Sequence, residues 1–209
     1  MRATDRLAEG LDAPICLTWE LTYGCNLACV HCLSSSGRRD PDELSTSELF
    51  AVVDELAAMQ VFYVNIGGGE PTLRPDFWDL LDYCVASKVG VKFSTNGSRI
   101  TPAAAARIAA TDYVDVQISL DGADAATNDA VRGAGSHRMA LDAMDRLAAA
   151  GMRGFKISVV VTRENVDQPR VVEKGEPAVA VVVRQRAEPL VAQADLRVQR
   201  VRRHGPAGQ

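Results

Sequence analysis

Three cysteines stand close together near the start of the chain, at Cys25, Cys29 and Cys32. Thiolates at this C-x3-C-x2-C spacing can bind three irons of an iron–sulfur cubane and leave the fourth iron with open coordination positions. Most electron-transfer clusters use four cysteines, so the triplet favours a cluster that binds a further ligand. Two alternatives stay open. One is a zinc site completed by His31, although its adjacency to Cys32 would strain joint ligation, and the other is thiols that bind nothing.

A second motif is the run Gly67-Gly-Gly-Glu70-Pro71, which ends a predicted strand. Glycines let a ligand lie against the backbone, and the exposed backbone groups can pair with the ammonium of an amino acid. The alternative is a tight turn before the breaks at Pro71 and Pro75. Because this motif follows the cysteine triplet by one strand, the pair favours a ligand site.

Strands and helices alternate along the chain up to about Thr162. A capping-box pattern from Ser45 to Glu48 opens one amphipathic helix, and Thr101-Pro102 opens another. The predicted strands cover 15–21, 61–66, 91–95, 114–120 and 155–161, and two further helices cover 76–88 and about 137–150. Five strand–helix repeats at this spacing predict an α/β fold with a parallel sheet, either open or curled into a barrel.

The predicted strands alternate between apolar and polar residues, as 114–120 illustrates with Val116 and Ile118 on one face and Gln117 and Ser119 on the other. Parallel strands covered on both faces are nearly continuously apolar, so polar groups under a helical layer must point into a lumen. The same pattern places further polar residues on that face, namely Thr18, Glu20, Tyr63, Asn65, Lys92, Ser94, Asn96, Asp115, Asp121, Lys156 and Ser158. Solvent-facing edge strands are the alternative for one or two of these. We therefore predict a polar barrel interior that holds a ligand.

Composition excludes several classes of protein. The chain has 209 residues, 47% of them hydrophobic, and a net charge of −4, which is ordinary for a single globular domain with a core. It shows no apolar run long enough for a membrane span and no secretory signal in its first residues. An odd number of cysteines, three of them clustered, favours a metal site in a reducing cytoplasm over a disulfide framework.

The last 44 residues differ from the rest. They carry a net charge of +3, contain four of the nine prolines, and lack aromatic residues, so base stacking with nucleic acid is not expected. We expect an N-terminal extension at 1–12, a core domain at 13–165 and an atypical tail at 166–209, in which 178–183 is a potential strand without an evident partner. Out-of-frame reading of GC-rich DNA would produce such a tail, and the coding DNA near codon 166 tests this.

Residues 13–165 resemble the radical S-adenosylmethionine (SAM) superfamily. The cysteine triplet after the first strand and Gly-Gly-Glu-Pro after the second form the hallmark pair. Ser94-Thr-Asn-Gly97, Ser119-Leu-Asp-Gly122 and Asn128-Asp-Ala-Val-Arg132-Gly133 resemble the branch that carries C-terminal SPASM-type auxiliary clusters. More narrowly, the stretch LDAPICLTWELTYGCNLACVHCLSSSGRRDP is similar to the mycofactocin radical SAM maturase family.

This resemblance implies a [4Fe–4S] cluster on the three cysteines and SAM chelated to its open iron. An electron from the cluster would cleave the sulfonium, and the resulting 5′-deoxyadenosyl radical would take a hydrogen atom from the substrate. By motif match, Gly68, Gly69 and Glu70 contact the SAM ammonium, Ser119 and Arg132 its carboxylate, and Asn96 its nucleoside. The resemblance also implies a partial (β/α)6 barrel, incomplete after the fifth strand.

Structural alternatives exist for these residues. Glu70 can cap the following turn, Ser119 can satisfy a neighbouring backbone group, Arg132 can be a solvated surface charge, and Asn96 with its following glycine is a standard turn pair. His31 is expected to pack near the cluster without ligating it. The two remaining cysteines, Cys16 and Cys84, are expected to be buried structural thiols.

The maturase resemblance further implies a substrate and partners. The substrate is the C-terminal end of a ribosomally made precursor peptide, whose terminal tyrosine is oxidatively decarboxylated and then joined to the preceding valine. A peptide-binding chaperone protein delivers it, and an electron donor reduces the cluster. The family continues into a cysteine-rich domain, whereas no cysteine follows Cys84 here. We therefore expect a truncated chain that binds cluster and SAM without completing maturation; an inactive fragment and a zinc-binding structural module are the alternatives.

Overall fold

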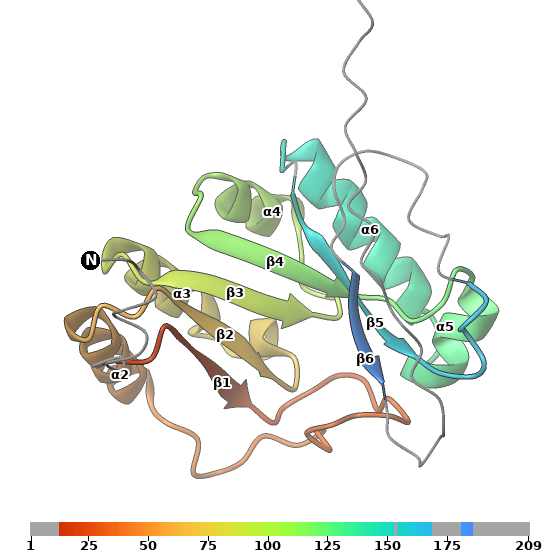
Figure 1. Cartoon of the computed structure of the whole chain (residues 1–209), viewed down its shortest axis with the longest axis horizontal. Coiled ribbons are helices and arrows are strands. Elements are labelled where there is room, and N and C mark those ends of the chain that lie inside the picture. Colours follow the sequence, from red (N-terminus) through yellow and green to blue (C-terminus); the bar gives the residue numbers. More distant parts are fainter. Residues whose placement is uncertain (1–12, 153, 169–180, 186–209) are drawn as a thin grey trace, which may run out of the picture.

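The computed structural model describes residues 13–152, 154–168 and 181–185. They form one sheet of six parallel strands that follow one another in chain order, each paired with the next (Figure 1). The strands are β1 (Cys16–Thr22), β2 (Tyr63–Gly68), β3 (Gly90–Thr95), β4 (Val114–Ser119), β5 (Lys156–Val161) and β6 (Val181–Gln185). The predicted α/β class and the five predicted strands are confirmed, with ends shifted by at most two residues.

Helices connect the strands and lie around the outside of the sheet (Figure 1). They are α2 (Thr46–Ala58), α3 (Phe77–Ala86), α4 (Pro102–Ala109), α5 (Ala125–Arg132) and α6 (Ser136–Ala149), with a short 3-10 helix, η1 (Pro71–Leu73), after β2. No helix in the described part of the chain is long and apolar enough to cross a bilayer.

The predicted helix starts are confirmed by their caps. Ser45 accepts a hydrogen bond from the Glu48 amide, and the Glu48 carboxylate accepts one from the Ser45 amide, so both halves of the capping box are present. At the start of α4, the Thr101 hydroxyl accepts a hydrogen bond from the Ala104 amide, with Pro102 at the first helical position. These local contacts fix where α2 and α4 begin.

The alternation of the strands sorts the two faces of the sheet as expected. The apolar face packs under the helices, where Val64, Phe93, Val116 and Ile118 are fully buried in one cluster with residues of α2, α3, α4 and α6. The polar face is divided into two hollows. The cysteine loop closes one at the carboxyl ends of the strands, while Tyr63, Lys92, Asp115 and Lys156 border a separate, open hollow at the amino ends.

Three features differ from the sequence-based expectation. Helix α5 was not predicted. The potential strand at 178–183, for which the sequence showed no partner, corresponds to β6. Val181–Gln185 pairs with β5 along its whole length, which adds a sixth strand to the expected five. Cys16 is exposed rather than buried, whereas Cys84 is fully buried as expected. The proposed extension at 1–12, and the tail apart from 166–168 and 181–185, lie outside the described residues.

Candidate functional site

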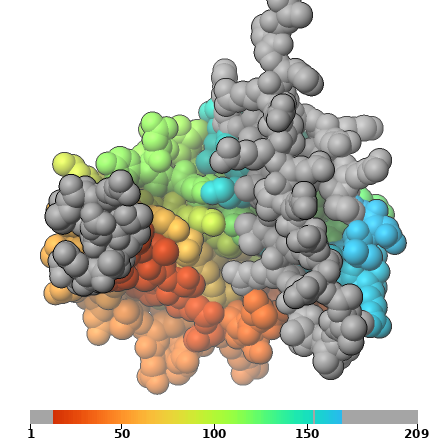
Figure 2. All heavy atoms as spheres, viewed as in Figure 1, coloured from red at the N-terminus to blue at the C-terminus, as the bar shows by residue number. Residues whose placement is uncertain are grey.

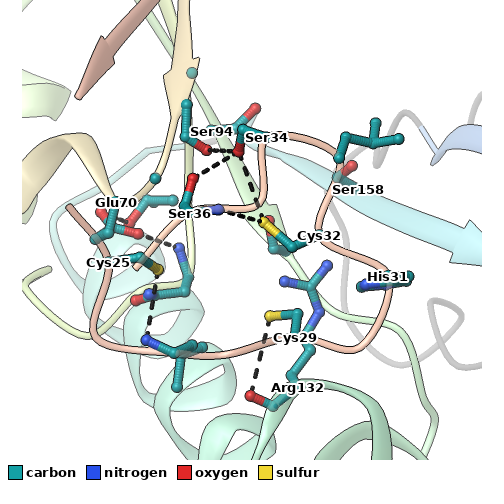
Figure 3. A pocket seen from close by; sticks show the side chains of 18 of the residues that line it. Cys25, Cys29, His31, Cys32, Ser34, Ser36, Glu70, Ser94, Arg132 and Ser158 are labelled. Carbon is teal, nitrogen blue, oxygen red and sulfur yellow. Dashed lines mark hydrogen bonds between the residues drawn. The ribbon is translucent and has the colours of Figure 1, made fainter. Parts of the chain in front are cut away.

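The three clustered cysteines lie in the loop of residues 23–45, which joins β1 to α2. The Cys25 amide donates to the Gly37 carbonyl at 3.0 Å and the Gly37 amide donates to the Tyr23 carbonyl at 2.8 Å, which draws the two sides of the loop together. The space-filling view shows the orange surface of this loop and α2 next to the red surface of β1 (Figure 2). This closed loop brings all three cysteines to one cavity of about 220 Å³ (Figure 3).

Each thiol in the cavity has a different environment. Burial raises the pKa of Cys25 and of Cys29. Burial also acts to raise the pKa of Cys32, but the hydrogen bond from the Ser36 amide, at 3.3 Å from Sγ, together with the neighbouring polar groups of Ser34 and Ser36, outweighs it and lowers that pKa. Cys32 therefore has the thiolate that the loop stabilises most.

The donor set fits an iron–sulfur cluster better than a single ion. Within the described residues, no three His, Cys, Asp or Glu side chains are grouped closely enough to ligate one metal ion. Thiolates that bind separate irons of a cubane need not converge on one point, and soft sulfur ligands suit iron–sulfur clusters. His31 does not join the cysteines in such a group among the described residues; its Nε2 lies 2.6 Å from an oxygen of Asp121.

The glycine run packs directly against the start of the cysteine loop. The Gly69 amide donates to the Thr22 carbonyl at 2.6 Å, and a Cβ on Gly69 would lie 2.2 Å from the Gly24 carbonyl oxygen. Gly68 has a φ of +103°, and its carbonyl accepts a hydrogen bond from the Ser34 hydroxyl. Gly67, in contrast, borders the cavity with open space where a Cβ would be. Gly68 and Gly69 therefore allow the two motifs to pack closely, while Gly67 leaves open space beside its Cα on the cavity side.

Glu70 is fully buried and its carboxylate joins η1 to β3. It accepts hydrogen bonds from the Thr95 hydroxyl and the Asn96 amide, both at 2.7 Å, and from the amide and hydroxyl of Thr72. Burial raises the pKa of this carboxyl, and these hydrogen bonds oppose the rise. Glu70 therefore does cap the following turn, and it also borders the cavity beside Cys25 (Figure 3).

The remaining predicted contacts for SAM come from three elements around the same cavity. Ser119 ends β4 and Asn96 follows β3, where the Asn96 side-chain amide donates to Asn26 Oδ1 at 2.9 Å and so reaches the cysteine loop. Arg132 ends α5 and is only 8% exposed, which excludes the alternative of a solvated surface charge. Its guanidinium points into the hollow beside Cys29 (Figure 3).

Asp121 is the residue that the sequence analysis missed, since it counted it only as one polar residue of the fourth strand. Its Oδ2 lies 2.7 Å from Arg132 Nε as well as 2.6 Å from His31 Nε2, and its Oδ1 accepts a hydrogen bond from the Val160 amide at 2.7 Å. Burial acts to raise the pKa of Asp121, but these partners outweigh it and lower that pKa. The signal in the sequence that could have identified Asp121 as a site residue is its position two residues after Ser119.

A family model described as the radical SAM superfamily matches residues 19–174 of the chain. The chain belongs to this superfamily. Membership implies SAM and an iron–sulfur cluster as cofactors, in agreement with the cysteine-lined cavity.

Individual relatives give a narrower likeness. The chain is similar to the mycofactocin maturase MftC of Mycobacterium tuberculosis strain H37Rv, with 71% identity over 167 residues, which are 80% of this chain and 43% of that protein. Its fold is similar to Streptococcus suis SuiB bound to S-adenosylmethionine, with a TM-score of 0.68 and 22% identity over 79% of this chain and 38% of that one. For the complex of SuiB with the precursor peptide SuiA, the TM-score is 0.67 and the identity 23%, over 79% of this chain and 37% of that one. The chain thus spans less than half the length of each.

Proposed function

We propose that this chain forms the SAM-cleaving core of a peptide maturase, in which Cys25, Cys29 and Cys32 hold a [4Fe–4S] cluster. The observation that carries the proposal is the convergence of these cysteines with Ser119 and Arg132 on one cavity at the carboxyl ends of the strands. Barrel enzymes place their sites at this end. When bound, the cluster and SAM supply the radical chemistry that removes a hydrogen atom from the substrate.

The residues of the chain bind and orient SAM. Arg132 is the cation suited to its carboxylate, because a guanidinium donates paired hydrogen bonds to a carboxylate, and Ser119 adds a hydroxyl from the end of β4. The open space beside Gly67, with Gly68, Gly69 and Glu70, suits the ammonium. Asn96 lies on the nucleoside side.

The substrate that we propose is the C-terminal end of a precursor peptide for mycofactocin, with oxidative decarboxylation of its terminal tyrosine and coupling to the preceding valine. The 71% identity to a mycofactocin maturase supports this chemistry. The cavity wall presents polar side chains to a substrate, among them Thr18, Ser94, Gln117 and Ser158, beside the charged Glu20 and Arg132. A peptide-binding chaperone and an electron donor complete the proposed assembly, and the free cysteines of the chain support a reducing, cytoplasmic setting.

Anaerobic reconstitution with iron and sulfide tests the cluster and SAM cleavage. We expect about four irons and four sulfides per chain and 5′-deoxyadenosine when SAM and a reductant are added. Changing any one of Cys25, Cys29 and Cys32 to alanine should abolish the nucleoside product. The matched control is Cys16→Ala, which removes an exposed thiol outside the cavity and should retain full cluster content.

The alternatives give different results in the same experiment. One zinc per chain without sulfide would overturn the proposal in favour of a structural zinc module. A full cluster without SAM cleavage would indicate an inactive core. The peptide step is followed by mass spectrometry with precursor peptide and chaperone present, where a decarboxylated or crosslinked product of this chain supports maturation.

A further inference from the structure

One buried carboxylate connects three separate elements of the site. Asp121 follows β4, and its side chain is 1% exposed. Its Oδ2 lies within hydrogen-bond distance of His31 Nε2 in the cysteine loop and accepts a hydrogen bond from Arg132 Nε of α5. Its Oδ1 accepts a hydrogen bond from the Val160 amide of β5. Both oxygens are therefore engaged, and a charged group this deeply buried is stable only with such partners.

The contact to Arg132 uses only one of the donors of its guanidinium. Nε is held by Asp121 at 2.7 Å, and neither Nη group donates to another residue in the described part of the chain. Arg132 borders the cavity, so the four remaining N–H groups are available to an anion there. Holding Nε restricts the rotation of the side chain, which lowers the entropy that Arg132 loses on binding a carboxylate.

The contact between Asp121 and His31 reaches the cysteine loop itself. His31 lies between Cys29 and Cys32, and its Nδ1 is buried without a hydrogen-bond partner among the described residues, so Asp121 provides the only polar contact of the ring there. The neighbouring Val30 amide donates to the Val131 carbonyl of α5 at 3.0 Å. The segment that carries two of the three cysteines is thus docked on the same helix end as Arg132.

We propose that Asp121 is a positioning residue that orients Arg132 toward the carboxylate of SAM and fixes His31, so that it sets the affinity for SAM and the seating of the cluster loop. This inference rests on the proposed function. The opposite effect on SAM affinity would follow if the Asp121 carboxylate, as an anion beside Arg132, competed with SAM for the guanidinium. Positioning predicts that removal of the Asp121 charge weakens SAM binding, whereas competition predicts that it strengthens binding.

The test compares Asp121→Asn with wild type as anaerobically reconstituted protein. The dissociation constant of SAM is measured by equilibrium dialysis, and the electron paramagnetic resonance spectrum of the reduced cluster is recorded with and without SAM. Loss of one charge-assisted hydrogen bond should raise the dissociation constant about tenfold. The change that SAM causes in the cluster spectrum should then require a correspondingly higher SAM concentration.

A double-mutant cycle with Arg132→Gln identifies the route of the effect. If Asp121 acts through Arg132, Asp121→Asn should weaken SAM binding in the wild type and have almost no effect in the Arg132→Gln background. The matched control is Asp115→Asn, which lies in β4 itself and is also ion-paired, to Lys156, but is outside the cysteine-lined cavity. It should leave the dissociation constant unchanged.

Unchanged or tighter SAM binding by folded Asp121→Asn protein would overturn the inference. If that variant does not fold, Asp121→Glu replaces it, since it keeps the charge and displaces the carboxylate by one methylene; it should also weaken SAM binding, and wild-type affinity would overturn the inference. A wild-type protein that neither binds nor cleaves SAM refutes the proposed function instead, so the two failures are distinguishable.

Discussion

Phe77 and Phe93 meet edge to face, with ring centroids 5.2 Å apart, where α3 packs on β3. Both rings are fully buried in the single apolar cluster that lies between the sheet and its helices. Phe93 lies in β3, three residues before Asn96, whose side chain reaches the cysteine loop through Asn26. The pair therefore supports the wall of the cavity from behind.

Replacing Phe93 by alanine should lower the free energy of unfolding of the apo chain by about 3–5 kcal/mol, because it removes a large buried ring and leaves a cavity. Urea denaturation followed by circular dichroism measures this change. Phe62→Ala is the control, since this side chain is 75% exposed and its loss should change the free energy of unfolding by less than about 0.5 kcal/mol. Equal effects of the two substitutions would contradict the assignment of Phe93 to the core.

The sequence was sufficient to predict the layers of the fold, because apolar alternation and helix caps are local signals. The polar face of the strands could be recognised from residues such as Gln117, which is 4% exposed yet borders the cavity. Sequence alone did not predict that this face divides into two hollows. That division depends on how the cysteine loop folds over one end of the sheet, which is a tertiary contact.

Helix α5 could not be predicted from hydrophobic periodicity, because its buried face is polar. Asn128 and Arg132 lie one turn apart and both face inward, where Asn128 accepts the Asp121 amide and Arg132 holds the Asp121 carboxylate. A helix pattern is recognised by apolar residues at this spacing, and here they are replaced by hydrogen-bonding groups. The contacts of Asp121 could not be predicted for a different reason, since His31 and Val160 come from distant parts of the chain.

Acid should weaken the interaction of Arg74 with Asp76, next to Glu43 near the carboxyl end of the cysteine loop. Arg74 donates two hydrogen bonds to Asp76, at 2.9 and 2.8 Å, and also binds the Glu43 carboxylate at 3.2 Å. The hydrogen bonds from Arg74, supported by the Thr46 hydroxyl, lower the pKa of Asp76 to about 2. The folded state therefore binds this proton less readily than the unfolded state does.

Because the pKa of Asp76 is lower in the folded state, its stabilisation is present above the ordinary value of 3.8 and is lost as the pH falls toward 2. Asp76→Asn should thus cost about 2 kcal/mol at pH 6, and the difference from wild type should shrink toward zero at pH 2. Urea denaturation of the apo chain across this pH range measures it. Asp79→Asn, on the exposed face of α3, is the control; a difference that stays constant with pH would contradict the prediction.

Gly69→Ala should separate the two hallmark motifs. The added Cβ would lie 2.2 Å from the Gly24 carbonyl oxygen, and because this neighbour is backbone it cannot move without shifting the cysteine loop. We expect a loss of at least about 2 kcal/mol in the free energy of unfolding and reduced iron content after reconstitution. Gly67→Ala is the matched control for folding, as its Cβ would meet nothing within 4 Å. Equal thermal stability of the two apo variants would show that the motifs are not packed as closely as described.

Cys16 and Cys84, the two cysteines outside the cysteine loop, should react with N-ethylmaleimide at very different rates. Cys16 is exposed on β1, whereas Cys84 is buried in α3, where burial raises the pKa of its thiol to about 12. Since the thiolate is the reactive form, a shift from the ordinary 9 to about 12 lowers its population roughly a thousandfold at neutral pH.

A variant with alanine at Cys25, Cys29 and Cys32 isolates these two thiols, and peptide mass spectrometry follows each one over time. Cys16 should be labelled within minutes in the native protein, and Cys84 only after urea is added, when both should react at similar rates. The unfolded sample is the control for intrinsic reactivity. Rapid native labelling of Cys84 would mean that α3 opens readily from the core, and it would contradict the close packing of this helix against β3.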